Sequence, residues 1–279
     1  MSAAIGSVWV LVFHGSRDPR SQQAATVITQ QVQHQMQLSQ RCPAVPAASS
    51  GGQSPWGRQA ETVAIAPVAP LAIADAYLEC QPLPLSEQLV QIVQQATGEL
   101  PGRDGPLRVQ VIPVLLLAGV HVREDIPAAV AIAQAQLPPT VQWEITHHLG
   151  SCAELHQLVR QRLTATPLDG WILLAHGSRR PGANQVIETL AAEVGAITAY
   201  WATPPDLATQ IQALQQQGRR RIGILPYFLS SGGITDAISQ TVTTLTQRDP
   251  NLSLSLAETL DHNAAIADIL VALAQRSNG

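Results

Sequence analysis

The chain has 279 residues, which allows one large α/β domain or two domains of roughly 140 residues each. Apolar residues make up 46% and charged residues 13%, so a sizeable core can form and global disorder is excluded. All 16 basic residues are Arg, and the absence of Lys excludes pyridoxal-type enzymes and P-loop NTPases. A formal charge of −4 gives no support to nucleic acid or an anionic membrane as a partner.

The cysteines and the N-terminal residues bear on where the protein works. Cys42, Cys80 and Cys152 lie far apart without a CxxC pair, which argues against a disulfide framework or an iron–sulfur site and favours a reducing compartment. The first apolar run follows no positively charged segment, so we expect a buried strand there rather than a signal peptide. No run reaches the roughly 18 apolar residues of a membrane span. We therefore expect a soluble, cytoplasmic protein.

The same blocks of sequence occur twice in the same order, which indicates a duplicated unit. The paired blocks are VWVLVFHGSR (8–17) with GWILLAHGSR (170–179), RVQVIPVLLLAG (108–119) with RRIGILPYFLSSG (220–232), and residues 146–163 with residues 258–275. We expect a first lobe over residues 1–166 and a second lobe over 167–279. The first copy is longer, and its surplus falls at about 39–60, a stretch rich in Ala, Pro, Ser and Gly. We interpret this stretch as a flexible surface loop, either a harmless insertion or a functional lid.

Short apolar runs alternate with helical patterns in both copies. The runs are apolar along their whole length, as in strands buried on both faces, and are expected at 7–13, 72–78, 108–116, 141–147, 170–175, 196–201, 220–226 and 252–257. Helices are expected at 21–38, 86–97, 127–136 and 207–217, with helix starts at Asp18-Pro19 and Asp125-Ile126-Pro127. This alternation predicts an α/β fold of two duplicated flavodoxin-like lobes. Each lobe is expected to be a parallel sheet flanked by helices, and the two to face each other, joined near 164–169.

Three polar side chains follow strands of the first copy at the edge where ligands of open parallel sheets bind. His14 comes directly after the first strand, Glu79 after the second and His121 after the third. Singly, each could be a hydrogen-bonded turn residue or a solvated charge. Together, two imidazoles and one carboxylate predict either a site for a borderline divalent metal or a general-base cluster.

The second copy lacks most of this cluster. His176 matches His14, but GGITDAI (232–238) contains no His, and Tyr200-Trp201 take the places of Leu78-Glu79. We therefore expect one site per chain, in the first lobe, and a degenerate site in the second. His176 is a candidate substrate contact from across the cleft.

HGSRDPR before a helix, a strand ending in YLE, and PVLLLAGVHVREDIP together resemble the sirohydrochlorin chelatases of the CbiX type, which are class II chelatases. The resemblance covers nearly the whole chain and points to the long, two-lobed form of the family, with its chelatase-like fold. It implies a lyase that inserts a divalent metal into sirohydrochlorin without ATP, Fe²⁺ toward sirohaem or Co²⁺ toward cobalamin. The metal is then a substrate, and no prosthetic group is expected. His14 and His121 become metal-binding, proton-accepting histidines, and Glu79 becomes the third metal contact.

The tetrapyrrole of that family is rich in carboxylates, which Arg binds well in bidentate pairs. We expect Arg17, Arg123 and Arg179 to bind the substrate, with Arg20 on the same loops. The alternative is that Arg20 and Arg179 bond locally to acidic neighbours or helix caps. Two other functions stay open: a tetrapyrrole or metal carrier without turnover, and a metal-dependent hydrolase. A two-lobed monomer is sufficient for each.

Overall fold

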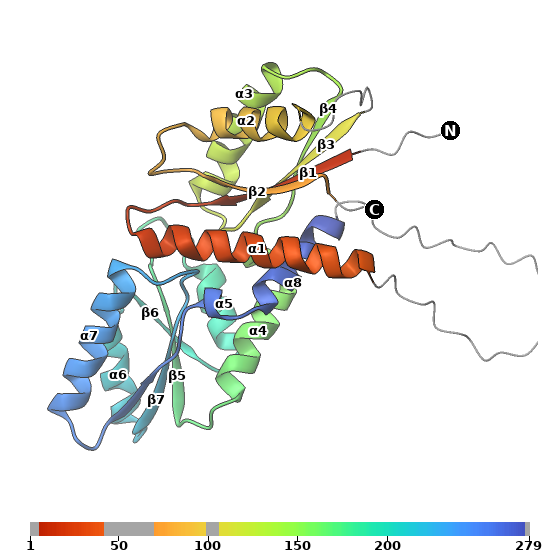
Figure 1. Cartoon of the computed structure of the whole chain (residues 1–279). Coiled ribbons are helices and arrows are strands. Elements are labelled where there is room, and N and C mark those ends of the chain that lie inside the picture. The colour runs from red at the N-terminus through yellow and green to blue at the C-terminus, as the bar shows by residue number, and fades with distance from the viewer. Residues whose placement is uncertain (1–5, 42–69, 99–105, 277–279) are drawn as a thin grey trace, which may run out of the picture.

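The computed structural model describes residues 6–41, 70–98 and 106–276, which form two lobes built on four-stranded parallel sheets (Figure 1). The first sheet has the order β2-β1-β3-β4, with β1 Gly6–Phe13, β2 Ala72–Tyr77, β3 Leu107–Pro113 and β4 Val141–Ile145. The second has the order β6-β5-β7-β8, with β5 Gly170–Ala175, β6 Ile197–Tyr200, β7 Arg221–Pro226 and β8 Ser253–Leu256. The shared order is flavodoxin-like and confirms the predicted fold. Only β3 and β4 end clearly earlier than expected.

Strand β1 lies at the centre of the first lobe and is buried on both faces. Its side chains alternate between two cores because successive residues of a strand point to opposite faces. Val8, Val10 and Val12 pack toward α2 Leu85–Gly98 and α3 Ile126–Ala135. Trp9, Leu11 and Phe13 pack on the opposite face, toward α1 Pro19–Arg41. The continuous apolar pattern of this strand is thus explained by its two covered faces.

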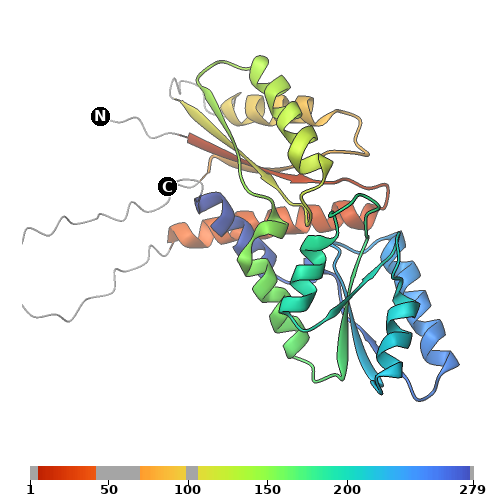
Figure 2. The ribbon, with the colours of Figure 1, turned by 180° about the vertical axis from the view of Figure 1, so that it is seen from behind.

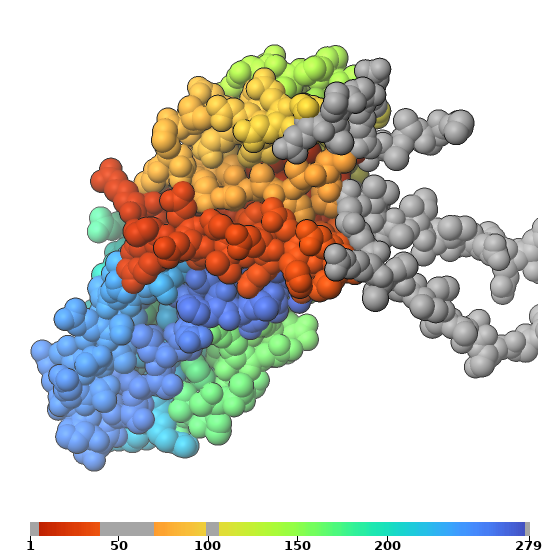
Figure 3. All heavy atoms as spheres, in the orientation of Figure 1, coloured from red at the N-terminus to blue at the C-terminus, as the bar shows by residue number. Residues whose placement is uncertain are grey.

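The helices that follow β4 and β8 are exchanged between the lobes. Helix α4 Ala153–Thr164 follows the first sheet but lies beside the second, whereas α8 Ala265–Arg276 follows the second sheet and packs against α1 and β3 (Figures 1 and 2). One buried cluster accordingly contains residues from both halves of the chain. In the space-filling view, α1 runs across the molecule between the two lobes (Figure 3). The duplicated halves therefore share a core, which the repeat pattern did not predict.

Helix α1 begins at Pro19, as expected, and the Asp18 carboxylate accepts a hydrogen bond from the backbone N–H of Arg20 at 3.0 Å. The helix continues to Arg41, so residues 39–41 are helical and were wrongly assigned to the insertion. Residues 42–60 of that insertion lie outside the described residues, as does Cys42. Cys80 and Cys152 are free thiols.

The helix that contains α3 begins four residues before Asp125, so the expected helix start at Asp125 was wrong. A π-helical turn, His121–Asp125, runs directly into α3, and Asp125 has helical angles and caps nothing. The backbone N–H of Ile126 bonds the carbonyl oxygen of His121. Pro127 explains the wider turn, because its ring would clash with the carbonyl four residues earlier in a regular helix.

The second lobe is completed by three further helices, α5 Gln185–Glu193, α6 Leu207–Gln216 and α7 Gly233–Arg248. Within the part of the chain that the structure describes, no helix combines the length and apolarity needed to cross a bilayer.

Candidate functional site

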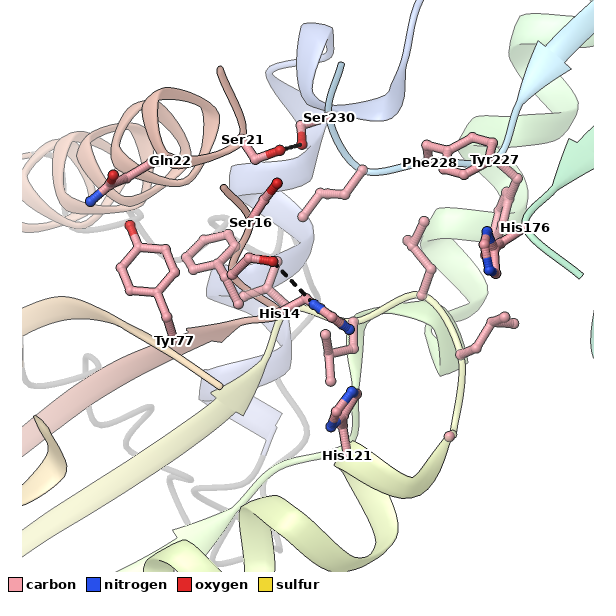
Figure 4. A pocket seen from close by; sticks show the side chains of 18 of the residues that line it. His14, Ser16, Ser21, Gln22, Tyr77, His121, His176, Tyr227, Phe228 and Ser230 are labelled. Carbon is pink, nitrogen blue, oxygen red and sulfur yellow. Dashed lines mark hydrogen bonds between the residues drawn. The ribbon is translucent and has the colours of Figure 1, made fainter. Parts of the chain in front are cut away.

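A cleft of about 370 Å³ opens between the carboxyl ends of the two sheets. Its walls come from the first lobe at the ends of β1, β2 and β3 and the start of α1, and from the second lobe at the ends of β5 and β7 (Figure 4). Most of the wall is apolar or aromatic, with Phe13, Tyr77, Leu115, Tyr227 and Phe228 among its residues. The cleft is thus at the edge where open parallel sheets bind ligands.

The three polar side chains predicted from the strand ends lie together. His14 and His121 line this cleft, and Glu79 lies beside them. One ligand atom each of His14, Glu79 and His121 can be chosen so that all lie within 4.8 Å of one another. Glu79 Oε2 is 4.0 Å from His14 Nδ1, and Glu79 Oε1 is 3.9 Å from His121 Nε2. The two imidazole rings meet edge to face, with centroids 4.7 Å apart. Figure 4 shows both rings pointing into the same space.

A close backbone approach holds His14 beside Glu79. The backbone N–H of Glu79 donates to the carbonyl oxygen of His14 at 2.9 Å, just beyond the last pair of β1 and β2. Gly15 makes this contact possible: its φ is +88°, and a Cβ there would lie 2.0 Å from the Glu79 carbonyl oxygen. The HGS turn of the sequence therefore serves the geometry of the cluster.

His121 has a carboxylate partner that the sequence analysis missed. The Asp125 Oδ2 atom lies 2.6 Å from His121 Nδ1, across the π-helical turn. His and Asp four residues apart can share one side of a helix, and this spacing was the available signal. We had interpreted Asp125 as a helix cap.

The cluster is open to solvent. The side chains of His14 and Glu79 are 54% and 52% exposed, and that of His121 is 30% exposed. Two imidazole nitrogens and one carboxylate oxygen form a donor set suited to a borderline divalent ion such as Fe²⁺ or Co²⁺. Three donors leave coordination positions free, so an ion held there could be passed on.

Backbone pairing corrects the correspondence expected between the two copies. The bonds from Leu78 N–H to Phe13 and from Glu79 N–H to His14 are repeated by Trp201 N–H to Ala175 and by Ala202 N–H to His176. Ala202, rather than Trp201, therefore stands in the place of Glu79. The register of the sheet decides this, and a comparison of strand ends alone misplaced it by one residue.

The position of His121 is also filled by an apolar residue in the second copy. The bond from Tyr227 N–H to Leu174 repeats that from Val114 N–H to Val12, which aligns Ile234 with His121. His176 is retained and lines the same cleft, across from the cluster (Figure 4). The second lobe thus contributes one histidine to the shared cleft, and its described residues form no equivalent cluster.

The arginines expected to bind substrate lie outside the cleft wall. Arg17, Arg123 and Arg179 are exposed, and none of them lines the cleft. Whether they contact a large ligand at its periphery stays a prediction.

Arg20 is engaged in ion pairs, as the alternative interpretation had it. Its guanidinium lies 2.7 Å from Asp18 Oδ2 and 2.7 Å from Asp236 Oδ2 of α7, so it links the two lobes. Hydrogen bonds from Arg20 lower the pKa of both carboxyl groups. A hydrogen bond between Ser230 and Ser21 adds a second link between the lobes, at 3.3 Å.

Fold and site together define a two-lobed α/β protein of the chelatase-like class, with a His–Glu–His cluster facing a cleft between duplicated lobes. The family model described as CbiX matches residues 67–166 and again residues 170–277. The chain belongs to the CbiX family.

Similar proteins agree with this assignment. A sirohydrochlorin cobaltochelatase of Priestia megaterium is 25% identical over 169 residues, which are 55% of this chain and 55% of that protein. The chain thus spans about half the length of this curated relative.

Solved structures of chelatases share the fold. SirB from Bacillus subtilis with Fe³⁺ has a TM-score of 0.69 at 18% identity, covering 98% of this chain and 96% of that one. The sirohydrochlorin chelatase SirB from Bacillus subtilis subspecies spizizenii in complex with cobalt has a TM-score of 0.63 at 18% identity, covering 98% and 95%. At this identity the likeness establishes the two-lobed fold.

Proposed function

We propose that this protein is a sirohydrochlorin metal chelatase that inserts Fe²⁺ or Co²⁺ without ATP, for the synthesis of sirohaem or cobalamin. The observation that carries the proposal is the convergence of His14, Glu79 and His121 beside the cleft, with one ligand atom of each within 4.8 Å of the others. Membership of the CbiX family and the cobaltochelatase relative supply the substrate class.

The residues suit the steps of metal insertion. His14, Glu79 and His121 hold the incoming ion through three donors, and the remaining positions exchange water for ring nitrogens. Insertion releases the two pyrrole protons of the macrocycle, and a neutral imidazole nitrogen can accept a proton. In this proposal His14 and His121 serve first as metal ligands, and the nitrogens that are freed when the ion passes to the ring then accept the protons.

The cleft supplies the surfaces for the macrocycle. Its apolar and aromatic walls can cover the ring faces. His176, which lines the cleft from the second lobe, would touch the ring in this proposal. We assign the peripheral carboxylates of the ring to Arg17, Arg123 and Arg179 on the surrounding loops. Small closing movements of the two lobes would grip and bend the ring.

The organisation of the protein follows from this proposal. The first half of the chain, residues 1–166, supplies the catalytic cluster. The second half, residues 167–279, completes the cleft and has a degenerate site, and each half gives its last helix to the other lobe. A two-lobed monomer working in the cytoplasm, with no prosthetic group and with no nucleic acid or membrane as partner, is sufficient for the reaction. The formal charge of −4 is compatible with this.

The test is an absorbance assay of purified protein with sirohydrochlorin and Co²⁺ or Fe²⁺, compared with the protein-free rate. His121→Ala should abolish the enzymatic rate while the circular dichroism spectrum stays unchanged, and His176→Ala should reduce it far less. A normal rate in His121→Ala would reject the site. A wild-type protein that binds the tetrapyrrole but gives only the protein-free rate would be a carrier rather than an enzyme.

A further inference from the structure

We propose that Asp125 is a positioning residue that fixes the tautomer and the direction of His121, so that the Nε2 lone pair of His121 points at the metal position beside Glu79. The inference rests on the proposed metal-binding role of the cluster. It adds a residue that neither the family resemblance nor the strand-end pattern assigns.

The hydrogen bond decides the tautomer. An ionised carboxylate only accepts hydrogen bonds, so the 2.6 Å contact between Asp125 Oδ2 and His121 Nδ1 requires the imidazole proton on Nδ1. In the neutral ring, Nε2 then carries the lone pair. Nε2 is also the atom that faces Glu79 Oε1, at 3.9 Å. In its neutral form the ring thus presents an unprotonated ligand atom to the cluster.

The two histidines of the cluster differ in this respect. The Nδ1 atom of His14 has a neutral backbone acceptor, the carbonyl oxygen of Gly15, at 3.1 Å. His121 has a charged acceptor, and its side chain is the less exposed of the two. Hydrogen bonds to an ionised group are shorter and stronger than those to a neutral one. His121 is therefore the more firmly oriented ligand, as is common for metal-binding histidines with a carboxylate behind them.

The backbone is arranged to hold this pair. Both residues belong to the π-helical turn that Pro127 imposes, and the turn continues into α3, whose first residue Ile126 is fully buried. The second copy keeps neither member of the pair. Ile234 stands in the place of His121. Ala237, directly before the buried Ile238, stands in the place of Asp125, directly before the buried Ile126. The second copy thus has no carboxylate at the position of Asp125, and it also has no histidine at the position of His121 that such a carboxylate would orient.

The test uses the full chain, with Asp125→Ala and the matched control Glu124→Ala. Glu124 is an exposed carboxylate in the same turn, so its removal changes the local charge equally. Titration with Co²⁺ alone, followed by the visible absorption of the bound ion, should show affinity about 10- to 100-fold weaker in Asp125→Ala. Glu124→Ala should bind like the wild type. Asp125→Asn should fall between, because its amide oxygen can accept the same bond without the charge.

A second measurement reads the tautomer directly. Long-range ¹H–¹⁵N spectra of the metal-free protein should show His121 protonated at Nδ1 in the wild type and redistributed toward Nε2 in Asp125→Ala. Wild-type Co²⁺ affinity together with an unchanged tautomer in a folded Asp125→Ala protein would overturn the inference. Equal weakening by Glu124→Ala would overturn it too, because a general charge effect would then suffice.

His121→Ala separates this inference from the proposed function. If that change leaves Co²⁺ affinity intact, the metal site itself is misplaced. If it removes the affinity while Asp125→Ala does not, only the positioning role of Asp125 fails.

Discussion

The side-chain amide of Gln110, buried in the middle of β3, donates a hydrogen bond to the carbonyl oxygen of Ala274 in α8 at 2.9 Å. This bond joins the first lobe's sheet to the last helix of the second. The bond adds to a larger apolar contact, in which α8 packs on α1 through the buried cluster shared by both halves of the chain. The two lobes are consequently parts of one packed unit, with the cleft at its open end.

We therefore expect that shortening one buried side chain of α8 destabilises the whole protein. Leu270 is fully buried in the shared cluster, so Leu270→Ala should lower the free energy of unfolding by about 2–5 kcal/mol. Urea denaturation followed by circular dichroism measures this. Leu38→Ala on α1, where the side chain is 45% exposed, is the control and should change it by less than about 0.5 kcal/mol. Similar effects of the two changes would contradict the shared core.

The ion pairs of Arg20 should make the stability depend on acid. Arg20 lowers the pKa of Asp18 and Asp236, so their stabilising contribution is present above the ordinary carboxyl pKa of about 4 and is lost as the pH falls through the lowered values. The difference in melting temperature between wild type and Arg20→Ala should therefore exist at neutral pH and shrink in acid. High salt should reduce it as well, because the groups are exposed.

Arg248→Ala is the control for that experiment, because Arg248 is an exposed arginine for which no ion pair is found among the described residues. Its stability difference from wild type should not vary with pH. An Arg20→Ala difference that persisted unchanged well below the lowered carboxyl pKa values would argue against the ion pairs.

Gly15 should be required for the geometry of the cluster. Gly15→Ala places a Cβ against the Glu79 carbonyl oxygen at a positive φ, which should cost about 1–3 kcal/mol and displace Glu79. We expect weaker Co²⁺ binding in an absorption titration. Gly119 lines the same cleft, and a Cβ there would meet nothing within 4 Å. The control variant Gly119→Ala should therefore bind Co²⁺ normally. Undiminished binding by Gly15→Ala would show that the close approach is dispensable.

The two described cysteines should differ in reactivity. Burial, with a smaller effect of the nearby Glu154 carboxylate, raises the pKa of the Cys152 thiol, and Cys80 is exposed. A thiol with a raised pKa forms less of the reactive thiolate. Iodoacetamide should therefore alkylate the peptide with Cys80 and spare that with Cys152 until the protein is unfolded, as mass spectrometry would show. Equal labelling of both in the native protein would contradict the packing around Cys152.

The sequence predicted the sheets, the duplication and the cluster because each depends on local patterns. Continuous apolar runs mark strands covered on both faces, and parallel strands bring their carboxyl ends to one edge. His14, Glu79 and His121 could be placed together on that basis alone. Asp125 was interpreted wrongly, because an Asp two residues before a proline is typical of a helix start. The π-helical turn arises from backbone hydrogen bonding that composition does not reveal.

The sequence by itself thus determined which side chains follow the strands and so lie at the cleft. The tertiary structure decided how the two halves of the chain pack together. The exchange of α4 and α8, the pairing of Arg20 with Asp236, and Ala202 standing opposite His176 all depend on contacts between segments far apart in sequence. Such contacts are selected by how well side chains pack and pair in space. A periodic pattern marks only the apolar face of a helix, and the choice of the sheet that covers it belongs to the folded molecule.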